Sequence, residues 1–323
     1  MEFHFGRATG IMLKTLPYVA VRIGVGVLFG LFTLLYFGVV AAVVWFLGDA
    51  ISGLVQLVVF LGSFGIFLYV LRLLRQYVLY LVSAAHVATI AHAVDTGEVP
   101  ENQLSFGKRR VSDNFAEASA LFAVDRLVRS VLNQFNSAVI SLSNLVDFVP
   151  GLKQILTILR RAVSLAGQQL DEAILAYVFL HEEQGNWTAA RDGLVLYAKT
   201  WKPVLATAVV IVVGMYAVAG GAVLLVSPLA GVFGQLSPVG EIAGWAAVLG
   251  IVATLHFGLV GPWVKTVIVT TFLIESRDET PDSETMDYIE SKAGDFRAVV
   301  DNAAEEDDGE PASPGGPEAT ASD

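Results

Sequence analysis

Residues able to carry chemistry are few in this chain of 323 residues. His86 and His92 are six positions apart, so they do not share a helix face as metal-binding histidines at i, i+4 do. His181 precedes Glu182 and Glu183 at an expected helix end, where a solvated cluster is the ordinary interpretation. No H-E-x-x-H, P-loop, G-x-S-x-G or kinase motif occurs. The sequence therefore predicts no enzyme, cofactor or metal site, and it indicates neither nucleic acid nor a small-molecule substrate.

Two other patterns have plain structural interpretations. The adjacent acids Asp171 and Glu172 are predicted to lie on a helix surface rather than to act as an acid and a base. Gly24, Gly26 and Gly30 resemble a nucleotide fingerprint, but they lie inside a strongly apolar helix, where small residues indicate close helix packing. The chain has no cysteine, which excludes disulfides and thiolate sites.

Two ionisable residues lie in or near an expected membrane span. His256 is roughly 20 Å from the outer end of that span at about 1.5 Å per residue, and Lys265 follows Gly261-Pro262. An ionisable side chain inside a membrane indicates function by default. The alternative, which we favour, is a neutral, hydrogen-bonded His256 and a Lys265 that snorkels to cytoplasmic headgroups.

The composition is that of a membrane protein. Hydrophobic residues make up 54% of the chain and the mean hydropathy is +0.62, whereas charged residues are only 16%, against roughly 25% in ordinary soluble domains. The net charge of −11 is concentrated in residues 275–323, which hold 16 acidic and 3 basic residues. Such acidity is typical of proteins that work in high salt.

We expect an all-α, polytopic membrane protein with two transmembrane hairpins flanking a cytoplasmic helical domain. Four apolar runs are long enough to cross a bilayer: Tyr18 to Leu47, Leu54 to Leu71, Val204 to Val226 and Ile242 to Gly261. The last helix is expected to kink at Gly261-Pro262 and to continue to about Ile274. The second helix should extend past Arg75 into the cytoplasm, although a further span at Gln76 to Val94 is the alternative.

The expected order is an interfacial amphipathic segment (1–17), a hairpin with a cytoplasmic helix extension (18–94), a cytoplasmic or interfacial helical domain (95–202), a second hairpin (203–274) and an acidic, largely disordered tail (275–323). Basic residues cluster on one side of the spans, and this places both termini in the cytoplasm, with the protein in the plasma membrane. Segments ending at Pro17 and Pro203 each precede a hairpin, which suggests a weak internal repeat.

The middle domain is expected to hold an amphipathic helix from Asp113 to Val149, capped by Ser112 after a basic loop at Leu104 to Arg110. One side of it is polar but uncharged. The stripe consists of Ser130, Asn133, Ser137, Ser141 and Asn144. An ordinary half-buried helix, self-association between protomers and pore lining all remain open for it.

Further helices are expected at Leu152 to Glu183 and at Trp187 to Trp201, the second ended by Pro203. In the tail, a short helix is expected within Asp282 to Val300. From Glu305 onward the acidic and Pro/Gly-rich run predicts disorder. We interpret this tail as a solubiliser, with recruitment of basic partners as the alternative.

The run Gln168 to Phe179, followed by Asn186 to Gly193 and Tyr197 to Pro203, resembles haloarchaeal multi-pass membrane proteins. The resemblance covers mainly the middle domain and the third span, and it implies neither an activity nor a site. A fainter likeness in layout to choline-transporter-like proteins transfers nothing, because this chain has too few spans.

Two classes of function follow from the sequence. In the first, protomers form a homo-oligomer through the middle domain and enclose a path for ions or small solutes. In the second, a monomer or dimer is a non-conducting scaffold that binds membrane lipids or partner proteins.

Overall fold

The computed structural model describes residues 3–46, 52–114, 118–140, 152–235 and 259–308, with a few isolated positions between 241 and 252. Ser141, Asn144 and His256 lie outside these residues, as does most of the fourth expected span. Every regular element in the described ranges is a helix, which confirms the all-α class.

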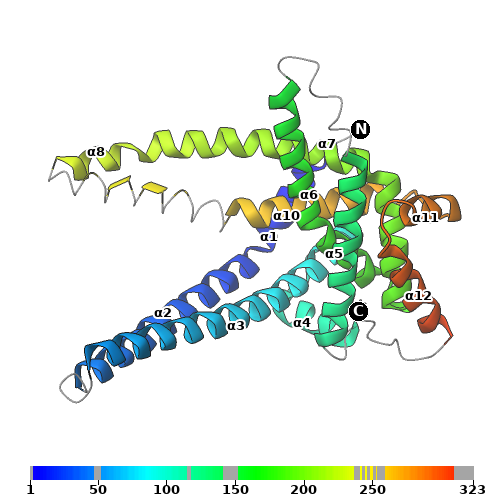
Figure 1. The fold of residues 1–323 in the computed structure, drawn as a ribbon. Helices are drawn as coiled ribbons and strands as arrows, with labels where there is room; N and C mark the ends of the chain where they lie inside the picture. Colours follow the sequence, from blue (N-terminus) through cyan, green and yellow to red (C-terminus); the bar gives the residue numbers. More distant parts are fainter. Residues whose placement is uncertain are drawn as a thin grey trace.

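Two long arms leave one helical body and diverge (Figure 1). The first arm contains α2 (Leu16–Phe46) and the beginning of α3 (Gly53–Thr96), and the second contains the later part of α7 (Asn186–Val226) and α8 (Pro228–Gly234). The body holds the rest of α3 and α7. Its other helices are α4 (Gln103–Asn114), α5 (Ala118–Ile140), α6 (Leu152–Leu180), α11 (Ser283–Glu290) and α12 (Phe296–Asp307), with α1 (Phe5–Lys14) and α10 (Gly261–Glu275) at the junction with the arms.

Three helices are long and apolar enough to span a membrane, over Leu16–Val43, Leu61–Thr96 and Asn186–Val232. In α2 no residue with a described side chain is buried beyond Val19. A helix that is apolar on all sides and that packs mainly against α3 suits a lipid environment.

The helix α3 runs without a turn through Gln76 and reaches Thr96, as the uninterrupted sequence predicts. It ends where Gly97 adopts a left-handed conformation with φ 82°, which glycine enters without steric cost. The second half of α3 is packed into the body, where Val87, Ile90 and Val94 are fully buried.

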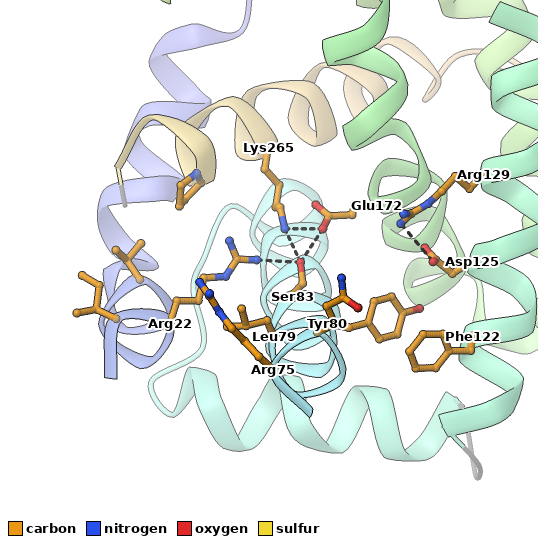
Figure 2. A pocket seen from close by; sticks show the side chains of 14 residues that line it. Arg22, Arg75, Leu79, Tyr80, Ser83, Phe122, Asp125, Arg129, Glu172 and Lys265 are labelled. Carbon is orange, nitrogen blue, oxygen red and sulfur yellow. Dashed lines mark hydrogen bonds and ion pairs between the residues drawn. The ribbon is translucent and has the colours of Figure 1, made fainter. Parts of the chain in front are cut away.

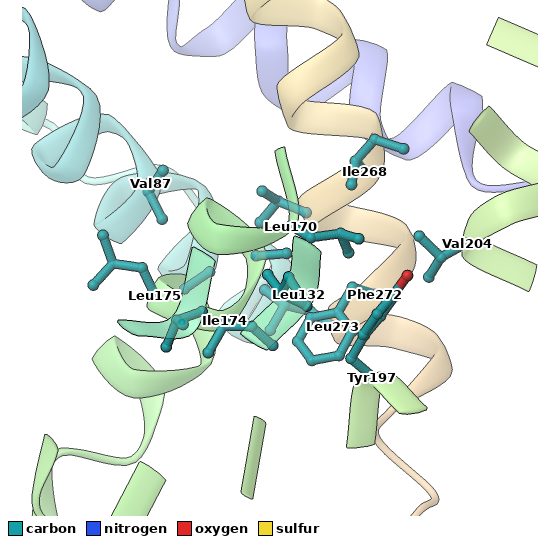
Figure 3. Close-up of a cluster of buried hydrophobic side chains, with 14 of the residues drawn as sticks. Val87, Leu132, Leu170, Ile174, Leu175, Tyr197, Val204, Ile268, Phe272 and Leu273 are labelled. Carbon is teal, nitrogen blue, oxygen red and sulfur yellow. The ribbon is translucent and has the colours of Figure 1, made fainter. Parts of the chain in front are cut away.

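The core of the body lies between α6, α7 and α10 (Figure 3). The helix α6 contributes Leu170 and Ile174, which meet Phe272 and Ile268 of α10 within one buried cluster. Burying such a side chain completely stabilises a fold by about 1.5–3 kcal/mol relative to leaving it exposed. In α10 every residue from Val264 to Leu273 is buried, so this part of the expected second hairpin is a core helix of the body.

Two expected boundaries in the middle of the chain are wrong. Residues 104–110 belong to α4 and not to a loop, and Ser112 lies in the last turn of α4, so it does not cap the next helix. Pro203 is inside α7 and does not end it. Proline removes one backbone hydrogen bond, but the turns on both sides of it keep theirs and the helix continues. The two units of the expected repeat differ at this point. Near Pro17 the chain breaks at Thr15, between α1 and α2, whereas near Pro203 the helix is continuous.

The tail also departs from the expectation. Its described part forms α11 and α12, so Glu305, Glu306 and Asp307 lie in a helix and not in a disordered run. Phe296 and Val299 are fully buried in the main core, whereas Asp282 caps α11 by accepting a hydrogen bond from the backbone N–H of Thr285 at 2.8 Å. The tail is thus part of the body up to residue 308.

Candidate functional site: a charged cavity where the arms meet the body

Four polar side chains from four helices converge at the base of the arms (Figure 2). Ser83 of α3 accepts a hydrogen bond from Arg22 of α2 at 2.9 Å and donates one to Glu172 Oε1 of α6 at 2.6 Å. Lys265 of α10 donates to the same Glu172 oxygen at 2.5 Å and also to Ser83 Oγ. Both acceptor positions and the single donor of the serine hydroxyl are therefore in use.

The position of Arg22 is fixed by a buried network one turn earlier. The Tyr18 hydroxyl donates to the Gln103 carbonyl oxygen at 2.6 Å and lies 2.9 Å from Thr89 Oγ1. Its ring stacks on His86 at a centroid distance of 4.7 Å. A Cβ at Gly107 would be only 2.2 Å from the tyrosine oxygen, so this glycine permits α4 to approach closely.

Lys265 does not snorkel, and this part of our favoured interpretation is wrong. Its residue is only 5% exposed, and its ammonium faces the buried ion pair instead of a headgroup layer. The physical reason lies in α10, which is covered by neighbouring helices and gives the four-carbon stem no route outward. The assumption of function for an ionisable residue inside a membrane span does not extend to Lys265, because α10 is a core helix of the body, and His256 lies outside the described residues.

A second charged group lies beside the first. Arg129 of α5 pairs with Asp125 one turn earlier at 3.3 Å and with Asp171 of α6. Burial and, after it, the neighbouring charge of Glu172 raise the pKa of Asp171 to about 7, against the opposing effect of Arg129. Burial likewise raises the pKa of Asp125, again against the effect of Arg129.

One wall of a cavity of about 910 Å³, which we call the junction cavity, is formed by Arg22, Ser83, Asp125, Arg129, Glu172 and Lys265. Its lining also includes Arg75, which is exposed, and Gln76. The remaining lining residues are apolar or aromatic: Val19, Ile23, Leu79, Tyr80, Phe122 and Pro262. The cavity therefore joins a cationic wall to an apolar one, which is the chemistry that an amphiphile requires.

The uncharged stripe of α5 is only partly free. Ser130 donates a hydrogen bond to Asp295, and Gln134 accepts one from the Asp295 backbone N–H at 3.3 Å, so the tail covers this end of the helix. Asn133 and Ser137 are exposed. None of these three stripe residues lines the junction cavity.

Sequence reasoning missed Asp171 and Glu172, which it assigned to a helix surface. Asp171 is 3% exposed, and both carboxylates take part in ion pairs. A signal was present, because α6 has no other charged residue from Ala162 to Leu180. Two acids in a long uncharged stretch indicate buried partners more than a solvated face.

Among the described residues, no three His, Asp or Glu side chains come close enough together to hold a metal ion. Comparison with protein families, with curated proteins and with solved structures finds no match. The chemistry of the junction cavity is therefore argued from its own geometry.

Proposed function

We propose that this chain is a multi-pass membrane protein that binds a membrane lipid in the junction cavity, at the inner end of its first arm and beside α10. The observation that carries the proposal is the pairing of an apolar wall with the cluster of Arg22, Ser83, Glu172 and Lys265. This is the non-conducting scaffold class of function, with the lipid as the bound partner.

The position of the cavity relative to the expected hydrocarbon layer supports a lipid ligand. The uncovered part of α2 from Ile23 to Phe46 is roughly 35 Å long at about 1.5 Å per residue, which matches a hydrocarbon layer of roughly 30 Å. Arg22 immediately precedes this stretch, and Arg75 follows the exposed apolar part of α3. Both cations are then at the depth of the phospholipid headgroups.

Access to the cavity is also favourable for a lipid. The two arms diverge from the body (Figure 1), and the cavity is lined by residues of α2 and α3 from one arm together with Pro262 and Lys265 of α10. We propose that lipid beside the first arm enters the cavity from the side formed by α2 and α3. Its chains stay in the hydrocarbon layer while its headgroup meets the cationic wall.

The test is retention of lipid through purification. Leu79→Trp adds volume inside the cavity, whereas Leu74→Trp adds the same volume on an exposed part of α3. We expect native mass spectrometry to find lipid bound to the wild type and to Leu74→Trp, and to find it lost from Leu79→Trp. A wild type that retains no lipid in mild detergent contradicts the proposal.

A second proposal concerns assembly. We propose that protomers associate through the free part of the α5 stripe, because Asn133 and Ser137 are exposed and uncharged on a helix whose other faces are packed. Amides and hydroxyls at such a surface suit hydrogen bonds between identical chains. The sequence also raises a path for ions or small solutes along the symmetry axis of such an oligomer. The conductance of the purified protein in a planar bilayer tests it.

A further inference from the structure

We infer that the junction cavity selects an anionic phospholipid, with the phosphate held by Arg22 and Arg75. The inference rests on the proposed lipid binding and specifies the headgroup. Two observations support it: the lining of the cavity has an excess of positive charge, and N–H donors of Arg22 and Arg75 have no hydrogen-bond partner among the described residues.

The wall of the cavity has more positive than negative charge. Its lining holds four cations, Arg22, Arg75, Arg129 and Lys265, against the carboxylates of Asp125 and Glu172. Asp171, which pairs with Arg129, is a third carboxylate, so one positive charge has no counterion in this group. An incoming anion balances that charge, whereas a zwitterionic headgroup brings a cation as well.

Arg22 has donors to spare. A guanidinium offers five N–H groups, and Arg22 uses Nη2 for Ser83, while its Nε is buried without a partner. No other donor of this side chain has a partner within the described part of the chain. A planar guanidinium with free donors matches two phosphate oxygens at once.

Arg75 adds a second cation to the same lining. It is exposed, and it makes no ion pair within the described ranges of the chain. Arg129 differs, because Asp125 and Asp171 already neutralise it. The free positive charge therefore lies on the side of the cavity formed by α2 and α3 (Figure 2).

The apolar wall favours a phospholipid over free phosphate as the source of the anion. Val19, Ile23 and Leu79 line the cavity next to the two arginines, and a soluble ion leaves this surface uncovered. Glycerol and the first methylenes of the acyl chains cover it. The phosphate then supplies specificity, while the chains match the apolar wall.

The experiment uses the full chain in nanodiscs or mild detergent with an equimolar mixture of phosphatidylglycerol and phosphatidylcholine. Native mass spectrometry counts which lipid is bound. We expect the wild type to enrich phosphatidylglycerol by about tenfold. Arg75→Gln should lower this enrichment severalfold. Since Arg75 is exposed and unpaired among the described residues, this variant should fold normally.

Arg72→Gln is the matched control, because Arg72 is exposed one turn earlier on α3 and does not line the cavity. It should keep the preference of the wild type. Arg22→Gln should lose the preference most completely. If the protein binds both lipids equally, or if Arg72→Gln and Arg75→Gln lower the preference alike, the anionic selection is overturned while lipid binding stands.

Two further outcomes separate the remaining sources of binding. Excess inorganic phosphate should not displace the bound lipid, and displacement overturns the assignment to a lipid headgroup. Absence of any retained lipid in the wild type instead removes the proposed function itself. Raising the salt concentration should reduce the preference for phosphatidylglycerol, because the contact with exposed Arg75 is screened.

Discussion

Glu306 Oε2 accepts a hydrogen bond from the backbone N–H of Trp187 at 2.8 Å, although the two residues are 119 positions apart. The same carboxylate accepts from Asn186 at 2.9 Å and from Thr188 at 3.1 Å. It thereby satisfies three N–H groups at the beginning of α7, where the helix dipole also favours a negative charge. Gly185 makes room for this contact, since a Cβ there would lie 2.4 Å from Glu306.

Glu306→Gln is therefore expected to destabilise the body by about 1–2 kcal/mol, because an amide cannot accept all three bonds with the strength of a carboxylate. Asp301→Asn removes a charge from an exposed position of α12 and is the control. Thermal unfolding in detergent measures both. Equal midpoints for Glu306→Gln and the wild type would show that the tail does not cap α7.

The buried acids of α6 and α5 predict an unusual dependence on pH. The folded pKa of Asp171 is raised to about 7, whereas an unfolded aspartate titrates near about 3.9. The folded state thus binds a proton more tightly, and its stability is lost as the pH rises through this window. The raised pKa of Asp125 acts in the same direction.

Between pH 5 and pH 7 we expect the free energy of unfolding of Asp171→Asn to fall less than that of the wild type, by on the order of 1 kcal/mol per pH unit. The exposed Asp113, changed to Asn, is the control and should keep the slope of the wild type. Parallel profiles for all three proteins would contradict a protonated Asp171 in the folded state.

The buried pair of Glu172 and Lys265 should behave non-additively. Glu172→Gln leaves the ammonium of Lys265 without a counterion and should cost about 3 kcal/mol, and Lys265→Met should cost a comparable amount. The double variant removes both charges and should lie within about 1 kcal/mol of the wild type. A double-mutant cycle on thermal unfolding measures the coupling, and additive losses would argue against a buried ion pair.

The arms follow from the sequence because long apolar runs are local signals, and α2, α3 and α7 are found where hydropathy places them. The helix α10 shows the limit of that reasoning. Its composition suits a lipid environment and a protein core equally, and only contacts with distant helices decide between them. An apolar run by itself therefore does not establish a membrane span.

The site was less predictable than the fold. Lys265 stood out as an ionisable residue in an apolar run, but its partner Ser83 is 182 positions away. No spacing rule relates residues that distant, and nothing local in the sequence distinguishes the partner of Glu172 from that of the adjacent Asp171. The stripe of α5 was visible from periodicity alone, yet its contact between Ser130 and Asp295 depends on how the tail folds back.

The positive-inside pattern predicts a cytoplasmic body, and the absence of cysteine makes this simple to test. Ser52 precedes α3 at the far end of the first arm, while Ser112 is exposed on α4 of the body. With a cysteine at each position in turn, an impermeant thiol reagent should label intact cells at residue 52 only. Labelling at residue 112 would invert the topology.

The last prediction concerns assembly through α5. Ser137 and Asn133 lie one turn apart on its exposed side, beyond the part that the tail covers at Ser130. If protomers meet there, Ser137→Glu brings like charges together near a symmetry axis and removes hydrogen bonds of about 1 kcal/mol each. The oligomer should weaken while the unfolding midpoint stays unchanged, because Ser137 is exposed in the single chain.

Ser112→Glu is the control, because it places the same charge on an exposed position of α4 and should leave the assembly intact. Size-exclusion chromatography with light scattering distinguishes the two variants, and a monomeric wild type would show that this surface faces only solvent or headgroups.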